Sequence, residues 1–399
     1  MNPLFWPMDD SDAAVGPAAD LPAASALGDA FRVEERRRDG DRVLYVGEPL
    51  LPADEIERRV WPAFRDAGYD VRLTRVTDSE PDPLSGVQIR NRRYALVAQP
   101  AGGGIDGVPW TNLLTFLLTV VTTLFVGSSW YYEPVNGPLD LVTGQSWQFS
   151  AAVLSVLAVH ELGHYVLSRY HGVNASLPYF IPFPSIIGTL GAVIRMDGRI
   201  PDRRALFDIG VAGPLAGLIA AVVVSVVGLT LDPIQVPQRV MESSSALEID
   251  FGYPLLLQFL ADVTGGQLEY ATPQRAVNPV VFGGWVGMFV TFLNLIPVGQ
   301  FDGGHLVRAM LGKRAESVAA VVPLGLLGLA GYLYVFADVG INAPILWGFW
   351  GVFTLGVAYV GSADPIYETP LGTARIAVGI LTFLFGALCF VPVPFRIIG

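Results

Sequence analysis

The 399-residue chain is poor in charge, because only 15% of its residues are charged while 52% are hydrophobic. Soluble chains carry about 25% charged residues. The composition therefore excludes an ordinary soluble globular protein. It predicts an integral membrane protein, a mainly α-helical polytopic bundle in a lipid bilayer with one small extra domain.

Lysine is almost absent, since Lys313 is the only one and the net charge is −11. Residues 1–108 hold 19 Asp and Glu against 13 Arg, so about half of the 36 acids lie in this quarter. No basic patch of the kind that binds phosphates stands out, so no nucleic-acid partner is expected. An acidic, lysine-poor composition favours a halophilic archaeal prokaryote as the source, because carboxylates stay hydrated in brine.

Cysteine is also nearly absent. Cys389, inside an apolar run, is the single one. It allows no disulfide within the chain and no cysteine zinc site. We expect a small buried apolar side chain.

The first hundred residues differ from the rest. Residues 1–30 are rich in Ala, Pro and Asp and lack an early basic cluster, which predicts a disordered acidic terminus and not a signal peptide. Residues 31–100 predict a small soluble α+β domain, with a helix at 52–69 between Pro52 and Gly68. The expected strands are 42–50, 70–76 and 94–100. The domain is either a site for a regulatory partner or an appendage without chemistry, and 101–110 is a flexible linker.

The remainder reads as membrane-spanning, since a helix needs about 20 apolar residues to cross the hydrocarbon. Seven runs qualify, namely 111–131, 149–168, 205–229, 280–298, 316–337, 344–361 and 374–394. The run 254–263 is too short to span. We divide this part into the first span, a core at 149–312 and three C-terminal helices within 313–399.

Basic residues in short loops set the expected orientation. They precede the first span and follow the second and the fourth, whereas the loops 132–148 and 230–279 are acidic or nearly uncharged. The N-terminus is therefore predicted to be cytoplasmic. The second and fourth spans then end on the cytoplasmic side.

The second span contains His160, Glu161 and His164, an H-E-x-x-H pattern. Ionisable groups in a span cost about 2.5–3.5 kcal/mol on insertion scales and indicate function. His160 and His164 are one helical turn apart on one face, so both imidazoles can bind one zinc ion. Glu161 is close enough to act as general base on a water there.

Zinc needs a third protein ligand. The segment NLIPVGQFDGGHL, at 294–306, ends the fourth span at the same expected membrane depth, and either Asp302 or His305 can supply the ligand. Taken alone, Asn294 suits a helix–helix hydrogen bond and 302–304 a plain turn. His171 is expected to be a surface residue without a partner.

Two further segments suggest an unusual interior. Residues 186–196, IIGTLGAVIRM, predict an extended or re-entrant hairpin whose edge can pair with a substrate strand, or else a short surface loop. Residues 210–217, GVAGPLAG, carry small residues that permit close backbone packing.

Together, HELGH at 160–164, GTLGAVIRM at 188–196, DIGVAGPLAG at 208–217 and NLIPVGQFDGGH at 294–305 resemble the site-2 protease family of intramembrane zinc metalloproteases, peptidase family M50. The resemblance covers about 149–312. The acidic N-terminal domain and late spans resemble the long-chain members that include plastid and prokaryotic relatives.

The resemblance implies roles for individual residues. His160, His164 and Asp302 are the implied ligands of one Zn2+ per chain, which selects Asp302 over His305. Glu161 is the implied catalytic base, and Asn294 is implied to hold the oxyanion or the substrate backbone.

The implied activity is hydrolysis of peptide bonds in membrane-protein substrates with a single span, at a site toward the cytoplasmic side of a prokaryotic cell membrane. A polytopic transporter is one alternative, and it predicts flux that survives Glu161→Gln. A proteolytically inactive scaffold is another, and a soluble-type metalloprotease tethered to the membrane is a third, which the apolar flanks of the motif oppose.

Overall fold

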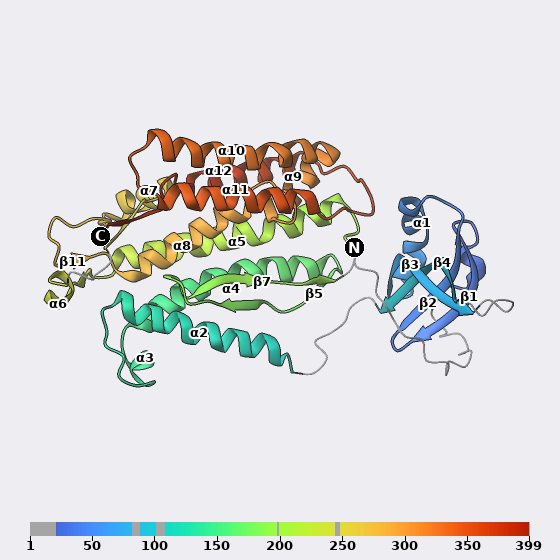
Figure 1. The fold of residues 1–399 in the computed structure, drawn as a ribbon, viewed down its shortest axis with the longest axis horizontal. Helices are drawn as coiled ribbons and strands as arrows, with labels where there is room; N and C mark the ends of the chain where they lie inside the picture. Colours follow the sequence, from blue (N-terminus) through green and yellow to red (C-terminus); the bar gives the residue numbers. More distant parts are fainter. Residues whose placement is uncertain (1–20, 82–87, 101–107, 198, 244–247, 399) are drawn as a thin grey trace. The chain divides into compact units, whose positions relative to one another are not determined.

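The computed structural model describes residues 21–81, 88–100, 108–197, 199–243 and 248–398 (Figure 1). The expected linker at 101–110 falls largely outside these residues, as does the expected disorder at 1–20. The chain forms two compact units, one of residues up to Asp106 with Gly172–Asn174, the other of Gly107–His171 and Ala175–Gly399. Each unit is described by itself.

The first unit is a four-stranded antiparallel sheet with one helix against it (Figure 1). The strand order is β1-β2-β4-β3. Its elements are η1 (Ala24–Leu27), β1 (Phe31–Asp39), β2 (Arg42–Pro49), α1 (Ala53–Asp66), β3 (Tyr69–Pro81) and β4 (Gln88–Pro100). Tyr45 and Phe64 are fully buried and meet edge to face at 5.3 Å between ring centroids. Gly68 follows α1 with φ +80°, a conformation that favours glycine.

Two features of this unit differ from the sequence-based expectation. Strand β1 was not expected, because its run FRVEERRRD carries few of the apolar residues that indicate a strand. The expected disorder of 1–30 does not extend over 21–30, where Leu27 and Ala30 are almost fully buried and η1 forms. Burial of a few apolar side chains overrides a disorder-prone composition there.

The second unit is mainly helical, and Figure 1 shows its long helices running side by side. Its helices are α2 (Trp110–Trp130), α3 (Asp140–Thr143), α4 (Ser146–Tyr170), α5 (Arg203–Thr230), α6 (Gln238–Met241), α7 (Leu255–Thr264), α8 (Pro279–Asn294), α9 (Asp302–Leu311), η2 (Gly312–Arg314), α10 (Ala315–Phe336), α11 (Asn342–Val360) and α12 (Thr373–Leu388). Its strands are short: β5 (Asn174–Ala175), β6 (Tyr179–Pro182), β7 (Thr189–Val193), β8 (Met196–Asp197), β9 (Ile234–Gln235), β10 (Glu248–Phe251), β11 (Arg275–Ala276) and β12 (Phe395–Ile398).

Five helical stretches among the described residues are long and apolar enough to cross a membrane. They are α2, α4, α5, α11 and the stretch Asp302–Phe336 that joins α9 to α10. The other two expected spans, 280–298 and 374–394, form helices of only 16 residues, α8 and α12. Such a helix is about 24 Å long, shorter than a hydrocarbon core of about 30 Å. Helix α8 ends early because the chain turns at Leu295 and Ile296 toward Asp302.

Helices α4, α5 and α8 form the centre of the second unit. Glycines bring them together: a Cβ on Gly163 of α4 would meet the Ala212 carbonyl of α5 at 2.7 Å, and one on Gly287 of α8 would meet Val156 of α4 at 2.6 Å. Each is closer than real Cβ contacts allow. Small residues at these crossings therefore set the spacing of the helices that carry the motifs, as expected for helix packing in membranes.

The expected hairpin at 186–196 exists, with its partner strand upstream of that range. Strand β7 pairs antiparallel with β6, through Tyr179 with Val193 and Phe180 with Ala192. Among the described strands only β6 pairs with β7. The other long edge of β7 therefore has no strand partner in the part of the chain that the structure describes.

An ionic cluster ties the α11–α12 connection to the start of α5 and to α9. Arg308 on α9 is buried and bonds Asp364 and Glu368, both at 2.7 Å. Arg203 on α5 donates to the carbonyl of Ala309 at 2.9 Å and to that of Met310 at 3.1 Å, near the C-terminal end of α9. A cation there complements the helix dipole. The cluster fixes α9, whose first residue is Asp302.

Arg308→Met is expected to lower thermal stability. The change removes the cation shared by Asp364 and Glu368 and leaves Glu368 only the longer pair with Arg203, at 3.6 Å, while the partial exposure of both carboxylates limits the cost to about 1–2 kcal/mol. Thermal unfolding in detergent measures the effect, with Arg314→Met, which removes an exposed arginine, as the control. Equal melting of both variants would show that the cluster contributes nothing to stability.

Candidate active site

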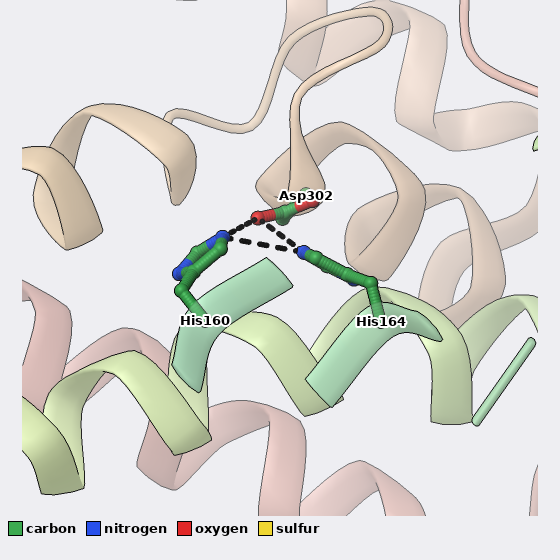
Figure 2. Close-up of side chains that lie close together, drawn as sticks. All are labelled: His160, His164 and Asp302. Carbon is green, nitrogen blue, oxygen red and sulfur yellow. Dashed lines mark hydrogen bonds and ion pairs between the residues drawn. The ribbon is translucent and has the colours of Figure 1, made fainter. Parts of the chain in front are cut away.

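His160 and His164 lie one turn apart on α4, and both side chains are buried although the helix is apolar. Their Nε2 atoms are 3.3 Å apart. Each lies 3.2 Å from Oδ2 of Asp302, the first residue of α9. Figure 2 shows the three side chains converging on one point from two different helices.

The spacing of these atoms fits a zinc ion. Two ligands on a tetrahedral zinc with bonds of about 2.0–2.1 Å are separated by about 3.3–3.4 Å. The three separations here, 3.2, 3.2 and 3.3 Å, are close to that value. Oδ2 of Asp302 is buried and has no hydrogen bond of acceptable geometry, so its proximity to the imidazoles is not explained by hydrogen bonding. Within the described residues these three form the one cluster with metal-ligand geometry.

The tautomer of His164 is also suited to metal binding. Its Nδ1 lies 2.8 Å from the carbonyl oxygen of Ile209 on α5, an oxygen that can only accept. Nδ1 therefore carries the proton and donates a hydrogen bond to this carbonyl. In the neutral ring this leaves a lone pair on Nε2, which faces Asp302. Ile209 lies in the DIGVAGPLAG segment, where the sequence alone had indicated only close packing.

Glycines on α5 make room for the imidazole rings. A Cβ on Gly213 would overlap the His164 ring, with Nε2 as its nearest atom, and one on Gly217 would lie 2.7 Å from Nδ1 of His160. Gly303 and Gly304, beside Asp302, lie against the backbone of Leu295 and Gly299 in the same way. The DGG sequence is thus the first turn of α9 pressed against the preceding loop, rather than a plain turn.

Asn294 is the last residue of α8, and its amide nitrogen lies 3.1 Å from Nε2 of His160. Its side chain therefore reaches the same centre as the three clustered groups. The sequence alone suggested a hydrogen bond between helices at Asn294. The amide does link α8 to α4, but its partner is Nε2 of His160, an atom of the cluster.

Glu161 is buried and follows His160 on α4. It is not one of the three converging groups. Strand β7 packs against α4, the helix of Glu161, and the backbone amide of Ile194, the residue after β7, lies near the carboxyl group. The hairpin therefore ends at the glutamate beside the cluster, a contact that sequence reasoning did not identify because the two are 33 positions apart.

Two histidines lie outside the cluster. His305 is buried on α9, with an Nδ1 that has no hydrogen-bond partner, and it is not among the converging groups.

The expectation that His171 is a surface residue without a partner is wrong. Its side chain is 17% exposed, and its Nε2 lies 3.0 Å from Asp208 of α5. Asp208 also pairs with Arg375 of α12, at 2.8 and 2.9 Å. The pairing joins residues distant in sequence, so no local signal indicated it.

The long apolar helices and the buried cluster of His160, His164 and Asp302 define a membrane protein with a candidate metal-binding centre. Residues 148–330 match the family model described as Peptidase family M50. This part of the chain, just under half of it, therefore matches the family of the site-2 proteases.

The relatives are chloroplast proteins, as the resemblance to long-chain plastid members suggested. The chain is similar to "Probable zinc metalloprotease EGY1, chloroplastic" of Arabidopsis thaliana, with 31% identity over 74% of this chain and 58% of the relative. It is 28% identical to the protein of that name from Oryza sativa subsp. japonica, over 73% of this chain and 54% of the relative. The EGY2 protein of Arabidopsis thaliana is 28% identical over 98% of this chain and 68% of the relative.

The chain spans about half the length of the relatives it matches first. Among solved structures, the site-2 protease from Methanocaldococcus jannaschii matches 65% of this chain and 93% of its own, at 22% identity and a TM-score of 0.28.

Proposed function

We propose that this protein is an intramembrane zinc metalloprotease that hydrolyses peptide bonds in or near the membrane spans of other proteins. The observation that carries the proposal is the convergence of His160, His164 and Asp302 between apolar helices, with the buried carboxyl group of Glu161 beside them. The names of the chloroplast relatives, which describe zinc metalloproteases, support the same activity.

In this proposal His160, His164 and Asp302 hold one zinc ion per chain. Zinc, when bound, supplies a Lewis acid that makes a water molecule nucleophilic near neutral pH. Glu161 accepts the proton of the attacking water and then passes it to the leaving amine. The Asn294 amide, which already reaches Nε2 of His160, donates to the oxyanion or to the substrate backbone.

The substrates we propose are proteins with a single span that unwind before cleavage, because a helical amide is shielded by its own hydrogen bonds. The unpaired edge of β7 takes the unwound segment by strand addition, which brings it past Ile194 to Glu161.

Several further features belong to the same proposal. The loop charges favour a cytoplasmic N-terminus and an active site toward the cytoplasm, with α8 and α12 completing seven crossings in a prokaryotic membrane. The short α8 and α12 cross only where the bilayer or neighbouring helices adapt to their length. For the sheet unit at 31–100 two roles stay open in this proposal, a site for a regulatory partner or an appendage without chemistry. The lysine-poor, acidic composition favours a halophilic archaeal source.

The experiment measures bound zinc and cleavage of a panel of single-span substrates in the purified protein. His160→Ala is expected to lose zinc and all cleavage, because it removes one of three ligands. His171→Ala is the matched control, since it removes a largely buried histidine at the C-terminal end of α4, outside the cluster, that pairs with Asp208. The proposal fails if the wild-type protein binds no zinc, or if His160→Ala and His171→Ala retain zinc equally.

A further inference from the structure

The hairpin of β6 and β7 is held from one side by the first span, α2. Three side chains of α2 donate hydrogen bonds to backbone carbonyls of the hairpin segment. Asn112 bonds the carbonyls of Leu177 and Pro178, at 2.8 and 3.1 Å. The Thr122 hydroxyl lies 2.7 Å from the carbonyl of Gly188 and 3.1 Å from those of Leu118 and Thr119 in its own helix, so Gly188 is its nearest acceptor. Trp130 bonds the carbonyl of Ile186 at 2.9 Å.

These bonds span the hairpin from base to tip. Asn112 and Trp130 are 18 residues apart on α2, or about 27 Å along the axis. They hold the chain just before β6 and the turn between the strands. Phe116 of α2 packs against Phe180 of β6 between them, with ring centroids 5.1 Å apart. Irregular backbone at membrane depth needs such partners, because lipid offers no hydrogen bonds.

Gly188 marks the closest approach of the hairpin to α2. A Cβ on this residue would lie 2.8 Å from Cα of Thr123 and 2.9 Å from the carbonyl oxygen of Thr122. Its φ of +86° also disfavours other residues. The hairpin tip therefore touches the α2 backbone itself, directly beside the hydroxyl that bonds Gly188.

Helix α2 is in turn fixed to α4, which carries the histidines and Glu161. Thr123 and Ser150 share a buried hydrogen bond of 2.7 Å between the two helices. A Cβ on Gly127 would lie 2.6 Å from the carbonyl oxygen of Ser146. The tip of the hairpin is thus positioned relative to α4 through two adjacent residues of α2, Thr122 and Thr123.

We infer that α2 sets the register of β7 against the catalytic glutamate, with Thr122, through its bond to Gly188, as the positioning residue. Gly188 and Ile194 are six residues apart, and strand β7 lies between them. A strand is stiff along its length, and displacement by one residue turns every side chain to the opposite face. An error at the Gly188 end is therefore carried along β7, which packs against α4, to Ile194 beside Glu161.

The inference rests on the proposed function for its catalytic consequence, but it also predicts a change in the hairpin itself. Thr122→Val removes the hydroxyl and keeps the shape, whereas Thr122→Ser keeps the hydroxyl. Thr115→Val is the control on the same helix, because within the described residues the Thr115 hydroxyl donates to the carbonyl of Asn112 one turn earlier and to no atom of the hairpin. None of these residues is near the metal cluster in sequence or shares its contacts.

The first measurement is amide hydrogen exchange of the segment 177–194 in detergent, which needs no substrate. Thr122→Val is expected to exchange about 3- to 10-fold faster there, as the loss of one hydrogen bond predicts, while Thr122→Ser and Thr115→Val exchange like the wild type. Bound zinc is expected to be unchanged in all three. Exchange in Thr122→Val equal to that of the wild type overturns the inference.

The second measurement is the pattern of cleavage products by mass spectrometry. Thr122→Val is expected to cut more slowly, by about 3- to 10-fold, and to spread its cuts over neighbouring peptide bonds. A general loss of stability would slow cleavage without moving the cut. Unchanged cut positions together with faster exchange would overturn the register role. If the wild type cuts nothing while Thr122→Val still loosens the hairpin, the proposed protease function fails and the α2 clamp on the hairpin remains.

Discussion

Glu161→Gln is expected to abolish cleavage while bound zinc stays at the wild-type level. The amide is nearly the same size as the carboxyl group, so the buried position beside the cluster remains filled. It cannot accept a proton, and general base catalysis contributes about 100- to 10,000-fold. Bound zinc and the cleavage rate, measured on the same preparation, test the expectation.

The matched control is Glu316→Gln, because Glu316 lies in the first turn of α10 and does not belong to the cluster of His160, His164 and Asp302. It is expected to cleave at the wild-type rate. Cleavage by Glu161→Gln within a few-fold of the wild type would remove Glu161 as the base. Loss of zinc in Glu161→Gln would instead point to a role in holding the ligands.

Gly213→Ala is expected to abolish zinc binding although it changes no ligand. The added methyl group overlaps the His164 ring, and α5 cannot withdraw easily because its carbonyl at Ile209 also holds Nδ1 of that ring. Displacement by about 1 Å is enough to break a ligand set whose bonds tolerate about 0.2 Å. Bound zinc, measured by metal analysis of the purified variant, tests the expectation.

Gly325→Ala provides the comparison, since a Cβ at this position of α10 would meet no atom within 4 Å. It is expected to bind zinc like the wild type and to have equal or slightly higher stability, because alanine favours helix over glycine. A Gly213→Ala protein that folds and holds one zinc per chain would show that the cradle on α5 is not needed.

Much of the site followed from local sequence. An H-E-x-x-H pattern places two imidazoles on one helical face whatever surrounds the helix, because the period of the helix is a property of the backbone. Long apolar runs also predicted helices α2, α4, α5, α10 and α11, because run length is a local property of the sequence. Asp302 was one of two candidates, and only the resemblance to a family separated it from His305.

Other features depended on contacts between distant residues. The length of α8 was overestimated, because hydropathy does not register the turn at Leu295 that directs Asp302 back to α4. His171 appeared solitary until α5 and α12 brought Asp208 and Arg375 beside it. Strand β1 was missed because most of its residues are charged, and only its pairing with β2 makes it a strand.

By itself the sequence determined that the chain lies in a membrane and which residue types can bind a metal, since composition, apolar run length and helical period are local properties. Tertiary structure decided that Asp302 and not His305 meets the two histidines, which carbonyl fixes the tautomer of His164, and how the hairpin is held beside Glu161. Those choices depend on distances between helices, and glycines at the crossings of α4, α5 and α8 set these distances through packing.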